Sequence, residues 1–362
     1  MNLELTDEQL ALRDTVRQYL AEKASVPGHV RPMLDDPTGS TDDVWHGLAR
    51  LGATGVLVPH EHGGAGMTMV DAGVVAEELG AALYPGPWLS SAVAATRALT
   101  RTGAGGELLA GIADGTVVAT VGGVTGSRPS ADRRTLHGEL TAVPDVAAAT
   151  VLLVFADGAD GPALYSVDPA SRGVTVSARA HVDPTRKLFD VTLDGVAARR
   201  LADAPADAVE ALVDDILIAL AADAVGVANA VMQLAVDYAK VRKQFDQPIG
   251  SFQAVQHLCV DMYESVELAR SGVIHALWAA DCAEPAERHL AAIRAKAFAG
   301  RLAAVGDTAI QVFGGIGFTW EHDAHLYLKR LLGWSALFGP PDRYLEEVGA
   351  ILASQLDRKV LL

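Results

Sequence analysis

The pattern of apolar and polar positions predicts helices at both ends of the chain. In the second half, apolar residues recur at helical spacing through three long segments, 208–241, 252–281 and 286–313. Near the N-terminus, Thr6 and Gln9 have the spacing of a capping box that opens an amphipathic helix. Further helical segments continue to about residue 115, so the N-terminal part is also predicted to be helical.

Between these helical parts the pattern changes to short runs rich in β-branched residues. GTVVATVGG, ATVLLVFA, ALYSV, GVTVSARA and KLFDVTLDGV are separated by Gly, Pro and Asp, which is typical of strands and turns. We therefore predict a mainly α protein with a central β module. Its parts are an N-terminal helical domain (1–115), a middle β domain (116–205) and a C-terminal helical bundle (206–362).

Composition narrows the class of protein. Half of the 362 residues are hydrophobic, so the chain has enough apolar material for a large core. The net charge of −16 argues against nucleic acid or an anionic membrane as a partner. Two cysteines provide neither a disulfide framework nor a metal cluster, which favours a reducing compartment. With no signal peptide and no long apolar run, we expect a cytoplasmic protein without a membrane span.

A glycine-rich stretch, IQVFGGIGFTW at 310–320, looks at first like a dinucleotide-binding loop. The strict fingerprint fails, because Trp320 occupies the third glycine position and a predicted helix, rather than a strand, precedes the stretch. The sequence instead predicts that Gly314 and Gly315 end a helix, where a positive φ is favoured.

Two segments resemble signatures of the acyl-CoA dehydrogenase flavoproteins. RKQFDQPIGSFQAVQHLCVDM (242–262) resembles R-x-x-F-G-x-x-h-x-x-x-Q, with Asp246 in place of the glycine, and QVFGGIGF (311–318) resembles Q-V-x-G-G-x-G. VPHEHGGAGMTMVDAGVVAEELG and the middle segments also look like the family, so the resemblance covers nearly the whole chain. It implies an N-terminal helical domain, a small β-barrel-like middle domain and a C-terminal four-helix bundle.

The resemblance further implies FAD-dependent α,β-dehydrogenation of an acyl-CoA, with electrons passing to an electron-transfer flavoprotein. In the family the ADP half of FAD reaches across a subunit interface. The implied contacts are a guanidinium for the pyrophosphate, apolar surface, amide groups and open backbone. The residues in these positions are Arg242, Phe245, Ile249, Gln253, Gln311, Gly314 and Gly315. Taken singly, Arg242 would be a solvated charge, and Phe245 and Ile249 would be core residues.

The family's catalytic glutamate has no evident counterpart. Its usual position, about twenty residues after the glycine segment, falls on Phe338, and Pro340 replaces the following threonine. Some members carry the base on an earlier helix, ten residues before the glycine of a Val-Gly pair. Counting back from Val225-Gly226 places that position at Ile216, so the catalytic residue of this chain is unknown.

The middle domain departs from the family as well. Its T-E-x-x-x-G-S-D run is reduced to VGGVTGSRPSAD, in which Thr125 and Ser127 are the polar remnants. The residues implied to hold a neighbour's FAD are kept, whereas those of the chain's own site are lost. This combination resembles the actinobacterial heterotetrameric acyl-CoA dehydrogenases of steroid side-chain breakdown, in which one subunit type is degenerate.

The expected partner is therefore a catalytic paralogue, with a homo-oligomer as the other arrangement. Two alternative functions are compatible with the same fold. In the first, the chain is a non-catalytic binding or scaffold protein. In the second, it is a relative that uses reduced flavin for oxygenation and needs no α-proton base.

Further residues carry side chains that are suited to catalysis or metal binding. Asp214 and Asp215 lie just before Ile216 and would replace the missing base, or else are solvated residues near a helix start. His322 and His325 would share a helix face, but without a third ligand we expect no metal site. The remaining candidates are expected to be packing residues: His257, Cys259, Cys282, Trp320 and Trp334. For the two tryptophans, the alternative is a wide aromatic pocket.

Overall fold

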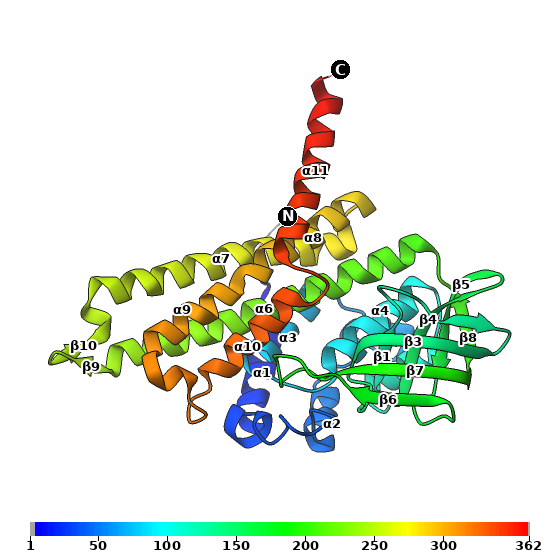
Figure 1. Cartoon of the computed structure of the whole chain (residues 1–362), viewed down its shortest axis with the longest axis horizontal. Helices are drawn as coiled ribbons and strands as arrows, with labels where there is room; N and C mark the ends of the chain where they lie inside the picture. The colour runs from blue at the N-terminus through cyan, green and yellow to red at the C-terminus, as the bar shows by residue number, and fades with distance from the viewer. Residues whose placement is uncertain (1–3, 361–362) are drawn as a thin grey trace.

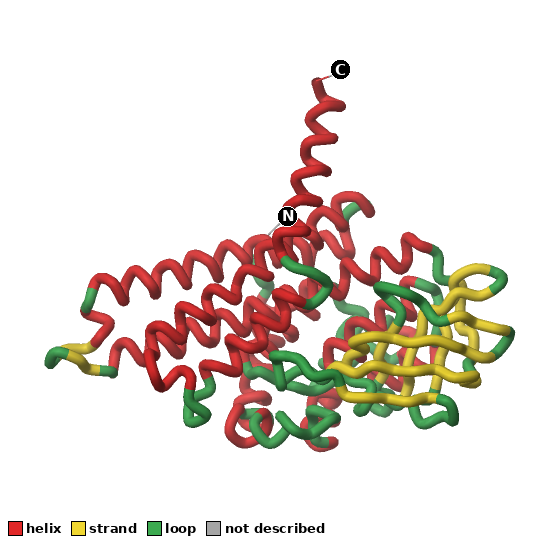
Figure 2. Tube along the Cα trace, in the orientation of Figure 1, coloured by secondary structure: helices red, strands yellow, loops and turns green. Residues whose placement is uncertain are grey.

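A computed structural model describes residues 4–360, with side chains described as far as Ser354. The helices of the N- and C-terminal parts pack against each other, and the strands gather at one end of the molecule (Figures 1 and 2). This is the helix, sheet, helix arrangement that the sequence predicts.

The N-terminal part is helical as far as Asp114. Thr6 caps the first helix as predicted, because its hydroxyl accepts from the N–H of Gln9 and the Gln9 side chain accepts from the N–H of Thr6. The helices are α1 (Asp7–Lys23), η1 (Val26–Val30), α2 (Asp42–Arg50), η2 (His60–His62), α3 (Met69–Ala81), η3 (Leu89–Ala95), α4 (Thr96–Arg101) and α5 (Gly106–Asp114).

The central part is one mostly antiparallel sheet. Its strands follow the order β6-β7-β3-β2-β4-β5-β8, and β1 pairs with β4 in parallel. Their bounds are β1 (Ala119–Gly122), β2 (Ser130–Asp132), β3 (Thr135–Pro144), β4 (Val151–Gly158), β5 (Gly161–Val167), β6 (Val174–Ala178), β7 (Leu188–Ala197) and β8 (Arg199–Asp203). On β7, Phe189, Val191 and Leu193 alternate into the core, as period-2 burial requires.

Long helices form the C-terminal part. They are α6 (Ala206–Val241), α7 (Gln253–Cys282), α8 (Pro285–Ala299), α9 (Ala303–Phe313), α10 (Ala324–Ala336) and α11 (Pro341–Val360). The predicted continuous helix 286–313 is interrupted by the 3-10 turn η5 (Gly300–Leu302). A β-carbon at Gly300 would lie 2.6 Å from Pro341, so glycine admits the start of α11 at this point.

Helices α3 and α6 cross closely through two glycines. A β-carbon at Gly226 would lie 1.9 Å from the carbonyl oxygen of Glu77, and one at Gly80 would lie 2.2 Å from that of Asp223. Gly226 of the Val-Gly pair is thus required by helix packing, which fixes the position of α6 beside the N-terminal part. Helix α11 packs through its first turns and then projects from the body (Figure 1). None of the described helices combines the length and apolar character that a membrane span needs.

Candidate functional site

The two signature segments meet at one end of the helical bundle. Tyr238, in the last turn of α6, packs its ring 5.1 Å from that of Phe313, the last residue of α9. A small hairpin follows α6 directly, and the glycine segment follows α9. Figure 1 shows the hairpin strands β9 (Lys243–Gln244) and β10 (Gln247–Pro248) at this tip.

The hairpin explains why aspartate stands where the family signature has glycine. Phe245 and Asp246 occupy its turn with φ of 50° and 64°, which is the left-handed region required at both central residues of a tight hairpin. Aspartate adopts this conformation more readily than most residues. Phe245 is 87% exposed, so its interpretation as a core residue is wrong, whereas half-buried Ile249 does pack against the core.

Three polar side chains of the predicted flavin contact lie at this tip. Arg242, Gln253 and Gln311 are exposed. No hydrogen bond or ion pair engages their side chains within the part of the molecule whose side chains are described. They are therefore free to bond a ligand or a second subunit.

The glycine segment ends α9, as predicted. Gly314 has φ 64° and ψ −142°, a combination that side chains rarely adopt, and its N–H bonds the carbonyl of Ile310. A β-carbon at Gly314 or Gly315 would meet no atom within 4 Å. Packing inside the chain thus gives no reason for the glycine at 315. Open backbone at the same end of the bundle as an exposed guanidinium fits the pyrophosphate contact implied by the resemblance.

The surface continues through apolar residues that follow the glycines. Ile316 and Phe318 belong to η6 (Gly314–Phe318) and are exposed, and Trp320 is 60% exposed. The expectation that Trp320 packs in the core is wrong. An exposed apolar group of this kind beside free polar side chains is typical of an interface.

A separate cavity of about 770 Å³ lies between the sheet, η3, α6 and the end of α10. Ile216 and Phe338, the two positions where a catalytic carboxylate would be expected, both line it. Thr125 and Ser127, the remnants of the middle-domain run, line it as well. Residues distant in the sequence therefore converge on one cavity, with apolar side chains at both positions that the resemblance implies for a base.

Phe338 is held in a constrained turn. Its φ is 61°, which is uncommon for a bulky residue, and Gly339 follows with φ 104°. The hydroxyl of Tyr344 donates a 2.8 Å hydrogen bond to the Phe338 carbonyl. Trp334, also a cavity residue, is almost fully buried, in agreement with a packing role.

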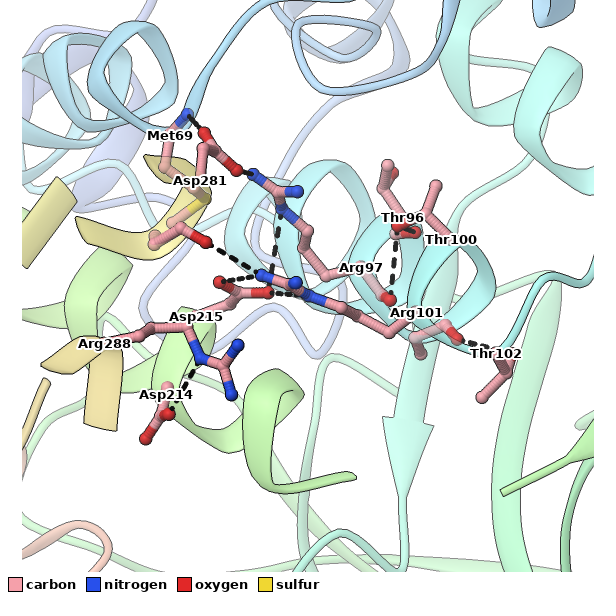
Figure 3. Close-up of polar contacts among 12 residues, drawn as sticks. Met69, Thr96, Arg97, Thr100, Arg101, Thr102, Asp214, Asp215, Asp281 and Arg288 are labelled. Carbon is pink, nitrogen blue, oxygen red and sulfur yellow. Dashed lines mark hydrogen bonds and ion pairs between the residues drawn. The ribbon is translucent and has the colours of Figure 1, made fainter. Parts of the chain in front are cut away.

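Asp214 and Asp215 are neither solvated nor part of the cavity lining. Both carboxylates are fully buried in α6 (Figure 3). Arg101 binds Asp215 through two hydrogen bonds of 3.0 and 3.1 Å, and Arg97 lies 3.7 Å from the same carboxylate. The interpretation as exposed residues near the helix start is wrong, because tertiary ion pairs bury these carboxylates. Bound to arginine and away from the cavity, Asp215 is poorly placed to act as a base there.

Asp214 belongs to a second network. It accepts from Arg288 Nε at 3.2 Å and contacts His289 Nδ1 at 2.9 Å, while His289 Nε2 lies 3.3 Å from Glu347 of α11. The hydrogen bond with Asp214 is the main cause that raises the pKa of His289 to about 9. Glu210, Asp214 and His289 also form a group with metal-like spacing, in which Arg288 and His289 bond Asp214 and Glu210 lies 3.7 Å from His289 Nδ1.

Sequence reasoning missed the charged residues of the cavity. Asp145, Arg186, Asp223 and Arg330 line it and come from four separate segments. Burial is the main cause that raises the pKa of Asp145 to about 6, and Ser90 donates a hydrogen bond to this carboxyl. Neither hydrophobic periodicity nor a motif marks such residues, because only the fold brings their segments together.

The structure also locates the remaining histidines and cysteines named from the sequence. His322 precedes α10 and accepts the N–H of Ala324, so it does not share a helix face with His325. His325 is buried edge-on to Trp320. Half-buried Cys259 packs against the core as expected, whereas Cys282 and His257 are exposed, so the packing expectation is wrong for them.

Comparisons with known proteins agree with this architecture. Residues 6–115 match the acyl-CoA dehydrogenase N-terminal domain, and residues 217–352 match the acyl-CoA dehydrogenase C-terminal domain. The chain is 34% identical to acyl-CoA dehydrogenase IpdE2 of Mycobacterium tuberculosis over 94% of its own length and 96% of that protein.

Two solved heteromeric structures are similar over nearly the whole chain. The ChsE4-ChsE5 complex from Mycobacterium tuberculosis gives a TM-score of 0.88 with 26% identity, covering 98% of this chain and 99% of that one. The Tcur3481-Tcur3483 steroid ACAD gives 0.85 with 30% identity, covering 97% and 99%. The domain matches, the near-complete coverage and the common fold together show that this chain belongs to the acyl-CoA dehydrogenase family.

Proposed function

We propose that this chain is the subunit of a heteromeric acyl-CoA dehydrogenase that lacks the catalytic glutamate and completes the FAD site of a catalytic paralogue. The observation that carries the proposal is the contrast between the bundle tip and the cavity of the same chain. Arg242, Gln253 and Gln311 are exposed at the bundle tip, with no hydrogen bond or ion pair to their side chains among the described residues, while Ile216 and Phe338 leave both base positions of the cavity apolar.

FAD is the cofactor of the family, and when bound it accepts the hydride that leaves the β-carbon of the acyl group. At the tip, the Arg242 guanidinium would pair with a pyrophosphate, and its fork of donors suits two phosphate oxygens. Backbone at Gly314 and Gly315 allows close approach, and the amides of Gln253 and Gln311 would bond the rest of the ADP half. Phe245 and Ile249 would supply apolar surface.

Removal of the α-proton requires a base within hydrogen-bonding reach of the α-carbon. Neither the Phe338 nor the Ile216 side chain accepts a proton, so that step is assigned to the paralogue's glutamate. Electrons would then leave to an electron-transfer flavoprotein. The steroid ACAD among the similar structures and the large cavity favour a bulky, steroid side-chain-type acyl-CoA as the substrate.

Co-expression with a paralogous acyl-CoA dehydrogenase chain that retains the glutamate tests the proposal. We expect the two chains to co-purify with one FAD per heterodimer and to oxidise acyl-CoA only together. A lone chain that holds a full complement of FAD and oxidises acyl-CoA would overturn it. A colourless chain without a partner would instead favour a scaffold, and oxygen consumption with reduced flavin would favour an oxygenase.

A further inference from the structure

His289 of α8 lies between two carboxylates of α6 and one of α11. Glu210 and Asp214 are one turn apart on α6, and one ligand atom from each of these two residues and from His289 lies within 4.8 Å of the others. Nδ1 of His289 is 2.9 Å from Asp214 Oδ1 and 3.7 Å from Glu210 Oε1. Neighbouring donor atoms of a tetrahedral zinc site are roughly 3.4 Å apart, so these three atoms have the spacing of ligands to one ion.

The three side chains range from buried to open. The side chain of Asp214 is 1% exposed, that of His289 is 26% exposed and that of Glu210 is 57% exposed. Asp214 therefore forms the base of the group and Glu210 its entrance, so an ion can reach it from solvent. No hydrogen bond engages the Glu210 carboxylate among the described side chains, which leaves it free to turn toward an ion.

Two further groups hold Asp214 and His289 in position. Figure 3 shows Arg288 Nε donating a 3.2 Å hydrogen bond to Asp214 Oδ2, while Asp214 Oδ1 faces His289. On the other side of the imidazole ring, Nε2 lies 3.3 Å from Glu347 Oε1 of α11. A metal-binding histidine usually donates its second N–H to a carboxylate in this way, which fixes the ring and its tautomer.

The charges of this group leave room for a further cation. Glu210, Asp214 and Glu347 each carry one negative charge, and Arg288 supplies one positive charge. The adjoining ion pairs already balance, with two carboxylates and two guanidiniums: Asp215, Asp281, Arg97 and Arg101. A neutral His289 therefore leaves two negative charges, which one divalent ion compensates. Without the ion, a proton on His289 compensates one of them.

We propose that Glu210, Asp214 and His289 bind one zinc ion, with solvent at the fourth position. Imidazole nitrogen and carboxylate oxygen both suit zinc, and three protein ligands with a water molecule are a common zinc arrangement. Mg²⁺ binds oxygen ligands and keeps its waters, so it should bind far more weakly. The ion takes the place of the proton on Nδ1, because a histidine ligand must be deprotonated at the binding nitrogen.

Such an ion would join α6 to α8, and through the bond of His289 with Glu347 it would also hold the first turns of α11. The site goes beyond the proposed function, because it is far from the bundle tip. At about 1.5 Å per residue, Asp214 lies about 40 Å along α6 from Arg242.

Calorimetric titration of the untagged full chain with ZnCl₂, after treatment with EDTA and removal of the chelator, tests the site. We expect one Zn²⁺ per chain and no measurable binding of Mg²⁺. Glu210→Gln should weaken zinc binding at least tenfold, since loss of even an outer partner costs about ten- to a hundredfold in metal affinity. Glu346→Gln is the matched control, because Glu346 is an exposed glutamate beside Glu347, and it should leave the zinc affinity unchanged.

His289→Gln removes the nitrogen ligand and should abolish the one-to-one binding. The melting temperature of the wild-type chain should rise with zinc concentration, and that of the His289 variant should not. Zinc binding that survives both ligand changes is adventitious and would overturn the proposal. Equal affinity of the wild-type chain for Zn²⁺ and Mg²⁺ would overturn it as well, and this comparison needs no variant. All measurements use one chain without FAD, so failure here is distinguishable from failure of the proposed flavin contact.

Discussion

Lys296 donates a 2.6 Å hydrogen bond to the backbone carbonyl of Trp334, and its ammonium lies 3.7 Å from the centroid of the same residue's indole ring. The lysine is fully buried in α8 and also bonds the carbonyl of Ser335 at 3.3 Å. These carbonyls belong to the last turn of α10, where cations are favourable. The contact thus connects the bundle core to the cavity wall just before Phe338.

The burial of Lys296 predicts a pH-dependent stability. Burial lowers its pKa in the folded chain to about 7 from an ordinary 10.5. Between these values the unfolded chain holds a proton that the folded chain has lost, so stability rises with pH across the window. Urea unfolding should show this rise in the wild type above about pH 9, where the opposite contribution of His289 has already been lost. Lys296→Met should lack it, whereas the exposed control Lys23→Met should retain it.

The His289 network predicts the opposite slope. Its pKa is raised to about 9 from 6.5, chiefly by Asp214, so the folded chain binds the proton more tightly than the unfolded one. This contribution is fully present below pH 6.5 and is lost as pH rises through about 9. His289→Gln should therefore be most destabilising at low pH and nearly neutral above the window. Hydrogen exchange should show faster opening of α11, through the lost Glu347 contact, and no such change in the exposed control His257→Gln.

Replacing Asp215 should cause a large loss of folding stability. Asp215→Asn leaves Arg97 and Arg101 without their shared buried carboxylate (Figure 3), and breaking a buried pair in this way costs about 3–5 kcal/mol. Chemical denaturation measures the difference. Asp203→Asn removes an exposed partner of Arg200 and should cost no more than about 1 kcal/mol. Equal effects of the two changes would contradict the burial argument.

Replacing Arg242 should cause the assembled complex to lose flavin. Arg242→Gln should weaken FAD binding by roughly ten- to a hundredfold, since a charge-assisted hydrogen bond contributes about 1.5–3 kcal/mol. Equilibrium dialysis of the co-purified complex measures the retained FAD. Arg200→Gln, an exposed change on β8, is the control and should retain it. An unchanged FAD affinity in the Arg242 variant would count against the contact across the interface.

Local sequence predicted the elements of this fold well, because their causes are local. The Thr6 cap, the alternating strands and the end of α9 at Gly314 each depend on neighbours in the chain. The break at Gly300 was missed, because its reason is the approach of Pro341, forty-one residues later in the chain. Burial of single residues was also missed at Phe245, Trp320 and Asp215, since side-chain chemistry alone does not report which surface tertiary packing covers.

The sequence by itself determined the family, the order of the three parts and the absence of a carboxylate at positions 216 and 338, because these depend on residue identity and spacing. Only the tertiary structure decided that Ile216 and Phe338 share one cavity and that Asp214 and Asp215 lie outside it. It also decided that Asp223, Tyr84 and Thr185, from three other segments, bond the guanidinium of Arg330. The physical reason is that burial and ion pairing depend on contacts between segments far apart in the chain, which no local pattern encodes.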